Sequence, residues 1–83
     1  MFFVYILQSV NKKYYIGCTQ DIYRRLHEHN RGLSKYTRNK GPWMLKYKEE
    51  YESLCLARKR ERQIKSWKKR EAIERLVNKG PVV

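Results

Sequence analysis

The chain has 83 residues, 41% of them hydrophobic, and a formal net charge of +12 from 20 Lys and Arg against 8 Asp and Glu. This length allows one small hydrophobic core, and the hydrophobic fraction argues against a disordered chain. Two cysteines exclude a disulfide scaffold, and the longest apolar run, residues 2–7, is too short to span a bilayer. We therefore expect one soluble, cytoplasmic domain over residues 1–83. Its excess positive charge points to a polyanion partner, with nucleic acid ahead of an anionic membrane surface.

The first two predicted elements are strands. Residues 2–7 are aromatic and β-branched, residues 14–18 have similar character, and the polar stretch between them predicts an antiparallel hairpin. If the turn is centred on Val10, Tyr5 lies opposite Tyr15. Side chains alternate between the faces of a strand, so both tyrosines then point to the same face of the sheet.

Four more elements follow from capping residues and hydrophobic periodicity: a helix over about 21–31, a strand over 43–51, and helices over about 54–66 and 68–78. On the strand, Trp43, Leu45 and Tyr47 alternate with other residues and predict one apolar face. The order β-β-α-β-α-α predicts an α+β fold, with a small three-stranded antiparallel sheet flanked by helices.

The first predicted helix places polar residues on its apolar face. At 100° per residue, Ile22 and Leu26 mark the buried stripe, Arg25 and His29 lie on or beside it, and Arg24 faces solvent. A single histidine in such a place is more often a core residue with a satisfied hydrogen bond than a functional group. Even so, this helix directs one arginine and one histidine toward the sheet.

The second predicted helix carries a similar exception. With Leu54 at the centre of the apolar stripe, Glu61 falls inside that stripe and Lys65 lies one turn beyond. A carboxylate that faces a core requires a cation or a metal ion, because an unpaired buried charge is strongly unfavourable. An ion pair between Glu61 and Lys65 and a metal site at Glu61 are both open.

Five of these residues together have the chemistry of a phosphodiester-cleaving site. A tyrosine can act as a general base, an arginine can neutralise phosphate charge, and a glutamate can bind a hard divalent cation. The set consists of Tyr5, Tyr15, Arg25, His29 and Glu61. If they converge, metal-assisted phosphodiester hydrolysis is the expected chemistry.

At these residues the sequence resembles the GIY-YIG nuclease superfamily, which includes the N-terminal endonuclease domain of the UvrC repair protein. Within it, the chain is most similar to the small stand-alone bacterial proteins that consist of little more than this domain. The second half of the signature is intact over residues 15–17, and the first half, residues 3–5, has Phe in place of Gly. Arg25, His29 and Glu61 match the positions of the family's catalytic Arg, its His or Tyr, and its metal-binding Glu.

The resemblance implies hydrolysis of phosphodiester bonds in DNA with one divalent ion, Mg²⁺ or Mn²⁺. Tyr5 would then be the general base that takes a proton from the attacking water, and Arg25 would neutralise the transition state. Tyr15 and His29 would position the water or the phosphate. Glu61 would hold the metal ion beside the leaving 3′ oxygen.

The sequence departs from the family where many catalytic members carry an Asn, some 12–15 residues after the Glu. Here residues 73–76 are Ile, Glu, Arg and Leu. The alternative function is therefore a non-catalytic module that binds nucleic acid and is recruited to a repair or processing complex. RNA is a third possible substrate. In each case we expect structure-selective or weakly specific contacts, because the chain has no separate element for reading sequence.

Two basic segments are predicted to contact phosphates. The first is the loop before the third strand, where Tyr36 can also stack on a base; the second spans the last two helices, where a solvated face with ion pairs is the plainer alternative. Together they contribute Lys35, Tyr36, Arg38, Lys40, Arg58, Lys65, Lys68 and Lys69.

Overall fold

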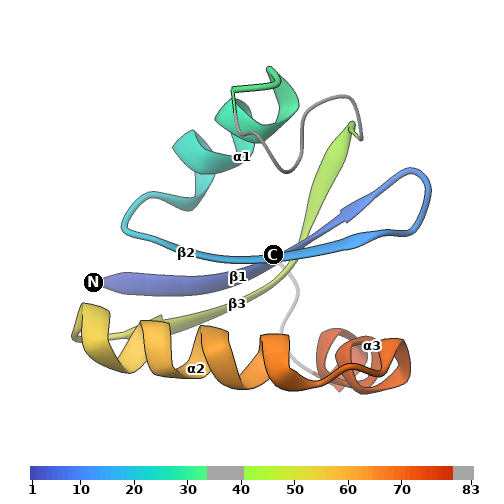
Figure 1. Ribbon diagram of the computed structural model, residues 1–83. Helices are drawn as coiled ribbons and strands as arrows, with labels where there is room; N and C mark the ends of the chain where they lie inside the picture. Colours follow the sequence, from blue (N-terminus) through green and yellow to red (C-terminus); the bar gives the residue numbers. More distant parts are fainter. Residues whose placement is uncertain (34–40, 80–83) are drawn as a thin grey trace.

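The computed structural model describes residues 1–33 and 41–79 and has the predicted order of elements (Figure 1). These are β1 (Phe2–Ser9), β2 (Tyr14–Thr19), α1 (Ile22–Asn30), β3 (Trp43–Tyr51), α2 (Leu54–Ser66) and α3 (Arg70–Lys79). The predicted α+β fold, with the order β-β-α-β-α-α, is therefore confirmed.

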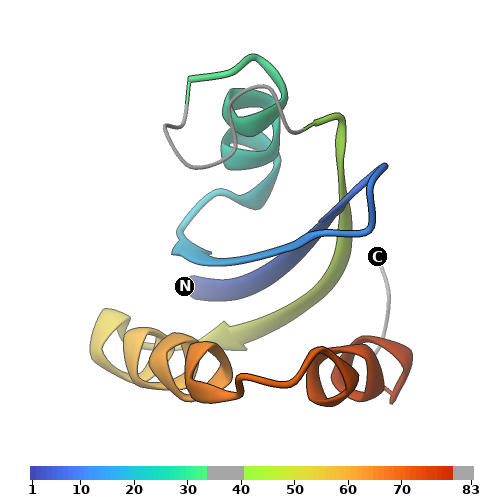
Figure 2. The same ribbon diagram turned by 45° about the vertical axis from the view of Figure 1, so that its right-hand side comes forward.

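The sheet is antiparallel in the order β2-β1-β3, so β1 is its central strand and β2 lies at an edge. Helix α1 covers one face of the sheet, whereas α2 and α3 lie end to end across the other face (Figures 1 and 2). Side chains of β1 therefore alternate between two helical layers, and each layer has its own apolar cluster.

The β1–β2 hairpin has a different register from the predicted one. Tyr5 pairs with Gly17 and Leu7 pairs with Tyr15, so the prediction that Tyr5 lies opposite Tyr15 is wrong. The turn is centred one residue later than Val10, which shifts the pairing by two residues. A shift of two preserves the face of each side chain, and Tyr5 and Tyr15 still belong to the same apolar cluster.

A β-bulge in β3 corrects the predicted apolar face of that strand. Ile6 pairs with Tyr47 while the next residue, Leu7, pairs with Leu45, so Lys46 is the extra residue. The bulge reverses the alternation. Trp43 and Leu45 consequently pack on the α1 side of the sheet, whereas Tyr47 packs on the α2 side.

The helices begin where capping residues satisfy their first amides. The Asp21 carboxylate accepts a hydrogen bond from the Arg24 amide, and the Ser53 hydroxyl accepts one from the Leu56 amide. The buried face of α2 is centred on Ala57 and Ile64, both fully buried. The apolar stripe of α2 is thus rotated from the predicted one, because Leu54 is 40% exposed.

The α3 helix begins at Arg70, two residues later than predicted, because Trp67 already has extended backbone and ends α2. Among the described residues, no helix has both the length and the apolar character needed to cross a membrane.

Candidate active site

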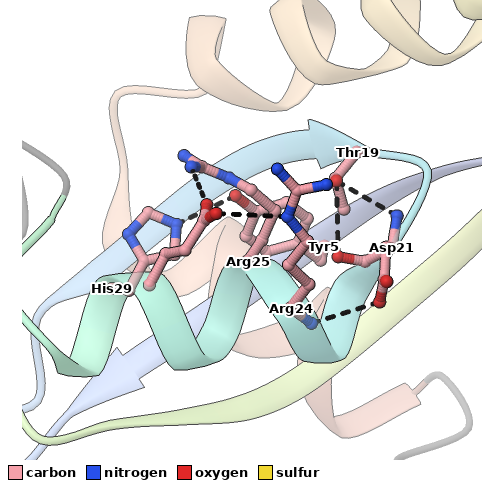
Figure 3. Close-up of polar contacts among 7 residues, drawn as sticks. Tyr5, Thr19, Asp21, Arg24, Arg25 and His29 are labelled. Atoms are coloured by element: carbon pink, nitrogen blue, oxygen red, sulfur yellow. Dashed lines mark hydrogen bonds and ion pairs between the residues drawn. The ribbon is translucent and has the colours of Figure 1, made fainter.

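Tyr5 is the centre of the candidate site. It lies on the central strand β1 and is only 1% exposed. Its hydroxyl is hydrogen-bonded to Nε2 of His29 on α1 at 3.0 Å, although the two residues are 24 positions apart in sequence (Figure 3). The predicted proximity of a tyrosine from the first strand and a histidine from the first helix is present in the structure.

Gly17 provides the space that the Tyr5 ring occupies. A β-carbon at position 17 would lie 2.4 Å from the Tyr5 hydroxyl oxygen and 2.5 Å from the adjacent ring carbon. Real β-carbons do not come this close to other atoms, so any side chain at position 17 would displace the phenol. The glycine of the motif is therefore required by a close approach across the β1–β2 pair.

Tyr15 and His29 are packed ring against ring. Their ring centres are 4.7 Å apart with an interplanar angle of 59°, and the Tyr15 ring centre is 6.3 Å from that of Tyr5. Trp43 of β3 lies at the far side of Tyr15, with a centroid distance of 6.4 Å. The four rings form one cluster between the sheet and α1, which limits how far His29 and Tyr5 can move.

The environment keeps Tyr5 and His29 uncharged at neutral pH. Burial raises the pKa of Tyr5 to about 12, although Arg25 has the opposite effect. Burial, assisted by the nearby Arg25 charge, lowers the pKa of His29 to about 4. At pH 7 the pair is therefore a protonated phenol beside a neutral imidazole, which can accept a proton.

Arg25 and Arg24 have the predicted orientations. The Arg25 side chain is 34% exposed and lies near Tyr5, whereas Arg24 is 75% exposed and faces solvent. Both guanidinium groups pair with Glu28, Arg25 at 2.6 Å and Arg24 at 3.3 Å (Figure 3). The hydrogen bond from Arg25 is the main reason that the pKa of Glu28 is lowered.

Glu61 lies on α2, which packs on the face of the sheet opposite to α1. Burial raises the pKa of Tyr5, and the negative charge of Glu61 adds to this rise; the same two causes act on Cys18 of β2. Because Tyr5 and Cys18 point to opposite faces, the Glu61 carboxylate exerts its field around the β2 edge. The site thus has a cationic side at Arg25 and an anionic side at Glu61.

The Glu61 carboxylate forms the predicted ion pair with Lys65 at 2.8 Å, and its side chain is 19% exposed. Among the residues that the structure describes, no group of three or more His, Cys, Asp or Glu side chains gathers to hold a metal ion. Glu61 therefore suits a Mg²⁺ ion that takes one protein carboxylate and completes its shell with water and substrate phosphate. The half-exposed Lys65 can leave the carboxylate for solvent.

The predicted phosphate-contacting residues are divided. Arg58, Lys65, Lys68 and Lys69 are all exposed, the first two on α2 and the others in the α2–α3 connection. Four further predicted residues lie outside the described part of the chain: Lys35, Tyr36, Arg38 and Lys40.

Sequence reasoning missed two carboxylates. Glu28, three residues after Arg25, could have been found from the helical spacing. Glu49 on β3 accepts hydrogen bonds from Tyr47, from Tyr51 at 2.6 Å, and from Arg60 of α2 at 3.0 and 3.1 Å. The period of two relates Glu49 to both tyrosines, but nothing in the sequence pairs it with Arg60.

These features define a small α+β domain with a Tyr–His–Arg site between a three-stranded sheet and its first helix, and a glutamate at the sheet edge. The family model described as the GIY-YIG catalytic domain matches residues 1–75, and the chain belongs to this family of nuclease-type domains.

Relatives support the assignment. The chain is 40% identical to a UPF0213 protein of Syntrophus aciditrophicus, over 95% of this chain and 92% of the relative. It is 41% identical to one of Halobacterium salinarum, over 78% and 86%. The solution NMR structure of the UPF0213 protein BH0048 from Bacillus halodurans superimposes with a TM-score of 0.60 at 35% identity, covering 94% of this chain and 84% of that one.

Proposed function

We propose that this protein is an endonuclease that hydrolyses phosphodiester bonds in DNA with a divalent metal ion held by Glu61. The observation that carries the proposal is the buried hydrogen bond between Tyr5 and His29 beside Arg25. A merely structural histidine would not require a phenol and a guanidinium next to it. We also infer that residues 1–83 act as one domain, which the family match over residues 1–75 supports.

Tyr5 acts as a proton relay in this proposal, because its raised pKa leaves it protonated at pH 7. The attacking water gives a proton to the Tyr5 oxygen while the phenolic proton passes to Nε2 of His29. The water oxygen bonds to phosphorus, and the bond to the 3′ oxygen breaks. The leaving oxygen then takes a proton from solvent, and His29 returns its proton to solvent through Tyr5.

Arg25 binds the non-bridging oxygens of the phosphate and neutralises the charge of the transition state. Burial opposes its charged form, but hydrogen bonds to Glu28 and Tyr5 raise its pKa, so the guanidinium stays charged throughout. A bound metal ion at Glu61 supplies positive charge for the leaving oxygen. The phosphate reaches Tyr5 past Arg25 and Tyr15, which are both partly exposed.

The proposal is tested by incubating the protein with supercoiled plasmid, branched DNA and single-stranded RNA, each with Mg²⁺, Mn²⁺ or EDTA. We expect metal-dependent nicking of DNA that Tyr5→Phe and Glu61→Gln abolish. Tyr23→Phe changes an exposed tyrosine of α1, and Glu74→Gln removes an equivalent i,i+4 ion pair on α3. These two matched controls should retain activity.

The second candidate is a module that binds nucleic acid without cutting it. It is favoured by residues 73–76, where an amide is absent and Ile73 and Leu76 pack against the core. Binding without cleavage of any substrate, in every metal, would establish this alternative and overturn the nuclease. In both cases about 6–8 phosphate contacts would weaken binding by roughly three orders of magnitude between 50 and 200 mM salt. The DNA repair role and the cytoplasmic location stay predictions.

A further inference from the structure

A groove runs between α2 and α3 on the side of the sheet away from α1. It consists of two hollows of about 390 and 410 Å³ that share Trp67 and Ala72 as lining residues. Each is within the size range of about 300–1,000 Å³ that is usual for ligand sites. Neither hollow is lined by Tyr5, Arg25 or His29, so the groove is separate from the candidate active site.

The groove has an apolar floor and a basic rim. Trp67, Ala72 and Leu76 are partly buried along its length. The rim consists of Lys68, Lys69, Arg75 and Lys79, all exposed. Within the described ranges, none of these four cations forms an ion pair, whereas Glu74 of α3 is paired with Arg70 at 2.7 Å. The rim therefore presents unneutralised positive charge around an apolar surface, which matches a ligand with anionic and apolar parts.

The indole of Trp67 is held in place from one side. The Arg60 guanidinium carbon lies 5.4 Å from the ring centre, and Arg60 is itself fixed by two hydrogen bonds to Glu49. Trp67 also packs against the main apolar cluster, yet it lines both hollows. A rigid aromatic ring at the floor of a basic groove is the arrangement on which an unpaired nucleobase stacks.

The groove lies within reach of a strand bound at the active site. Trp67 follows Glu61 by six positions, which corresponds to about 9 Å of rise along α2. A stacked strand advances about 3.4 Å per nucleotide, so this spacing corresponds to about three nucleotides. Figure 2 shows α2 and α3 joined end to end, so the strand can continue from the helix that carries Glu61 to the groove.

We propose that the α2–α3 groove binds an unpaired base of single-stranded DNA, with the base on Trp67 and the adjacent phosphates on the lysines and arginine of the rim. This inference rests on the proposed function, since it assigns a substrate class to the same protein. A base inside an intact duplex is already stacked and cannot enter. The groove therefore favours DNA with a branch, an overhang or a frayed end over continuous duplex.

The chain contains two tryptophans, so Trp43→Phe leaves Trp67 as the sole fluorescent reporter. In EDTA, where no cleavage occurs, we expect oligothymidylate to quench this protein and a duplex of equal length to quench it much less. The Trp67→Phe protein, which retains the 4%-exposed Trp43, serves as the matched control and should show little quenching. Quenching of the Trp43→Phe protein by neither DNA, or equally by both, overturns the proposal.

Affinity supplies the second measurement. Trp67→Leu should weaken single-strand binding by about tenfold or more, and duplex binding by less than twofold. Because Trp67 packs against the core, Lys68→Ala with Lys69→Ala is the companion variant at exposed positions. It should lower the salt slope of single-strand binding by about two. An unchanged slope contradicts the proposal.

The rival ligand is an acidic peptide with apolar side chains. If an oligopeptide of alternating Glu and Leu binds more tightly than oligothymidylate, the groove is a protein site and the inference fails. The outcome is independent of cleavage, because the titrations use EDTA and can be repeated with Tyr5→Phe. Quenching without any nuclease activity leaves the groove assignment intact and overturns only the nuclease proposal.

Discussion

The Tyr5 hydroxyl occupies the place that a side chain at position 17 would need. Tyr5 and Gly17 are paired across the β1–β2 ladder, and the phenol lies over the glycine because no β-carbon is present there. The strand pairing thus directs the hydroxyl toward His29 instead of into the apolar cluster. The glycine of the signature is in this sense part of the tyrosine's binding pocket.

Gly17→Ala should therefore reduce nuclease activity without touching any polar group of the site. The added methyl forces the buried Tyr5 ring to move, and overpacking of this kind costs about 1–3 kcal/mol in the free energy of unfolding. Plasmid nicking and urea unfolding measure the two effects. Cys18→Ala, at the neighbouring position on the other face of β2, should change neither by a comparable amount. Full activity in Gly17→Ala would show that the Tyr5 position is not critical.

The two adjacent arginines of α1 form a matched pair for a test of phosphate binding. Both contact Glu28, but only Arg25 also lies against Tyr5. Arg25→Lys should reduce the cleavage rate by about 10²–10³-fold, the usual loss when one transition-state donor is removed. Arg24→Lys should leave the rate nearly unchanged. Equal losses in the two variants would mean that general charge, and not the position of Arg25, supports cleavage.

His29 should make stability depend on pH. Its pKa is lowered to about 4 in the folded protein, whereas an unfolded histidine has a pKa of about 6.5. Between these values the unfolded chain binds a proton at His29 that the folded chain does not bind. The free energy of unfolding therefore falls as the pH drops from 6.5 to 4, by on the order of 3 kcal/mol.

Urea unfolding at several pH values, compared with His29→Gln, measures this contribution. The substitution should flatten the pH dependence over that interval, although it also removes the hydrogen bond to Tyr5. His27→Gln, which changes an exposed histidine on the same helix, is the control and should retain the slope. If His27→Gln flattens the curve as much as His29→Gln, the burial argument is wrong.

Glu49 joins β3 to α2. Burial opposes its ionisation, but hydrogen bonds from Arg60, Tyr47 and Tyr51 lower its pKa below the usual value. Glu49→Gln leaves Arg60 without its carboxylate and should lower the free energy of unfolding by about 2–3 kcal/mol. Thermal unfolding monitored by circular dichroism measures the change, with Glu50→Gln at the exposed neighbouring position as the control. A shift in Glu49→Gln no larger than in the control would show that the network adds no stability.

The sequence was sufficient for the order of elements, because strands, helices and caps follow from local periodicity. It was also sufficient for the faces of Tyr5, Arg25 and His29, since each follows from one element's own period. The hairpin register was not accessible, because the position of a turn within a polar stretch depends on its backbone conformation. Lys12, for example, has a φ of 63°. The bulge at Lys46 and the pairing of Glu49 with Arg60 depend on contacts between distant segments, which no local pattern encodes.

Asn30, at the end of α1, hydrogen-bonds both backbone groups of Trp43 at the start of β3. Its carbonyl oxygen accepts from the Trp43 amide at 2.6 Å, and its amide donates to the Trp43 carbonyl at 3.1 Å. The two attachment points of the intervening segment are therefore fixed by one side chain that does not belong to that segment. Insertions or exchanges between residues 31 and 42 should be tolerated by the scaffold. In a family that shares one catalytic framework, such a position allows substrate preference to diversify independently of the chemistry.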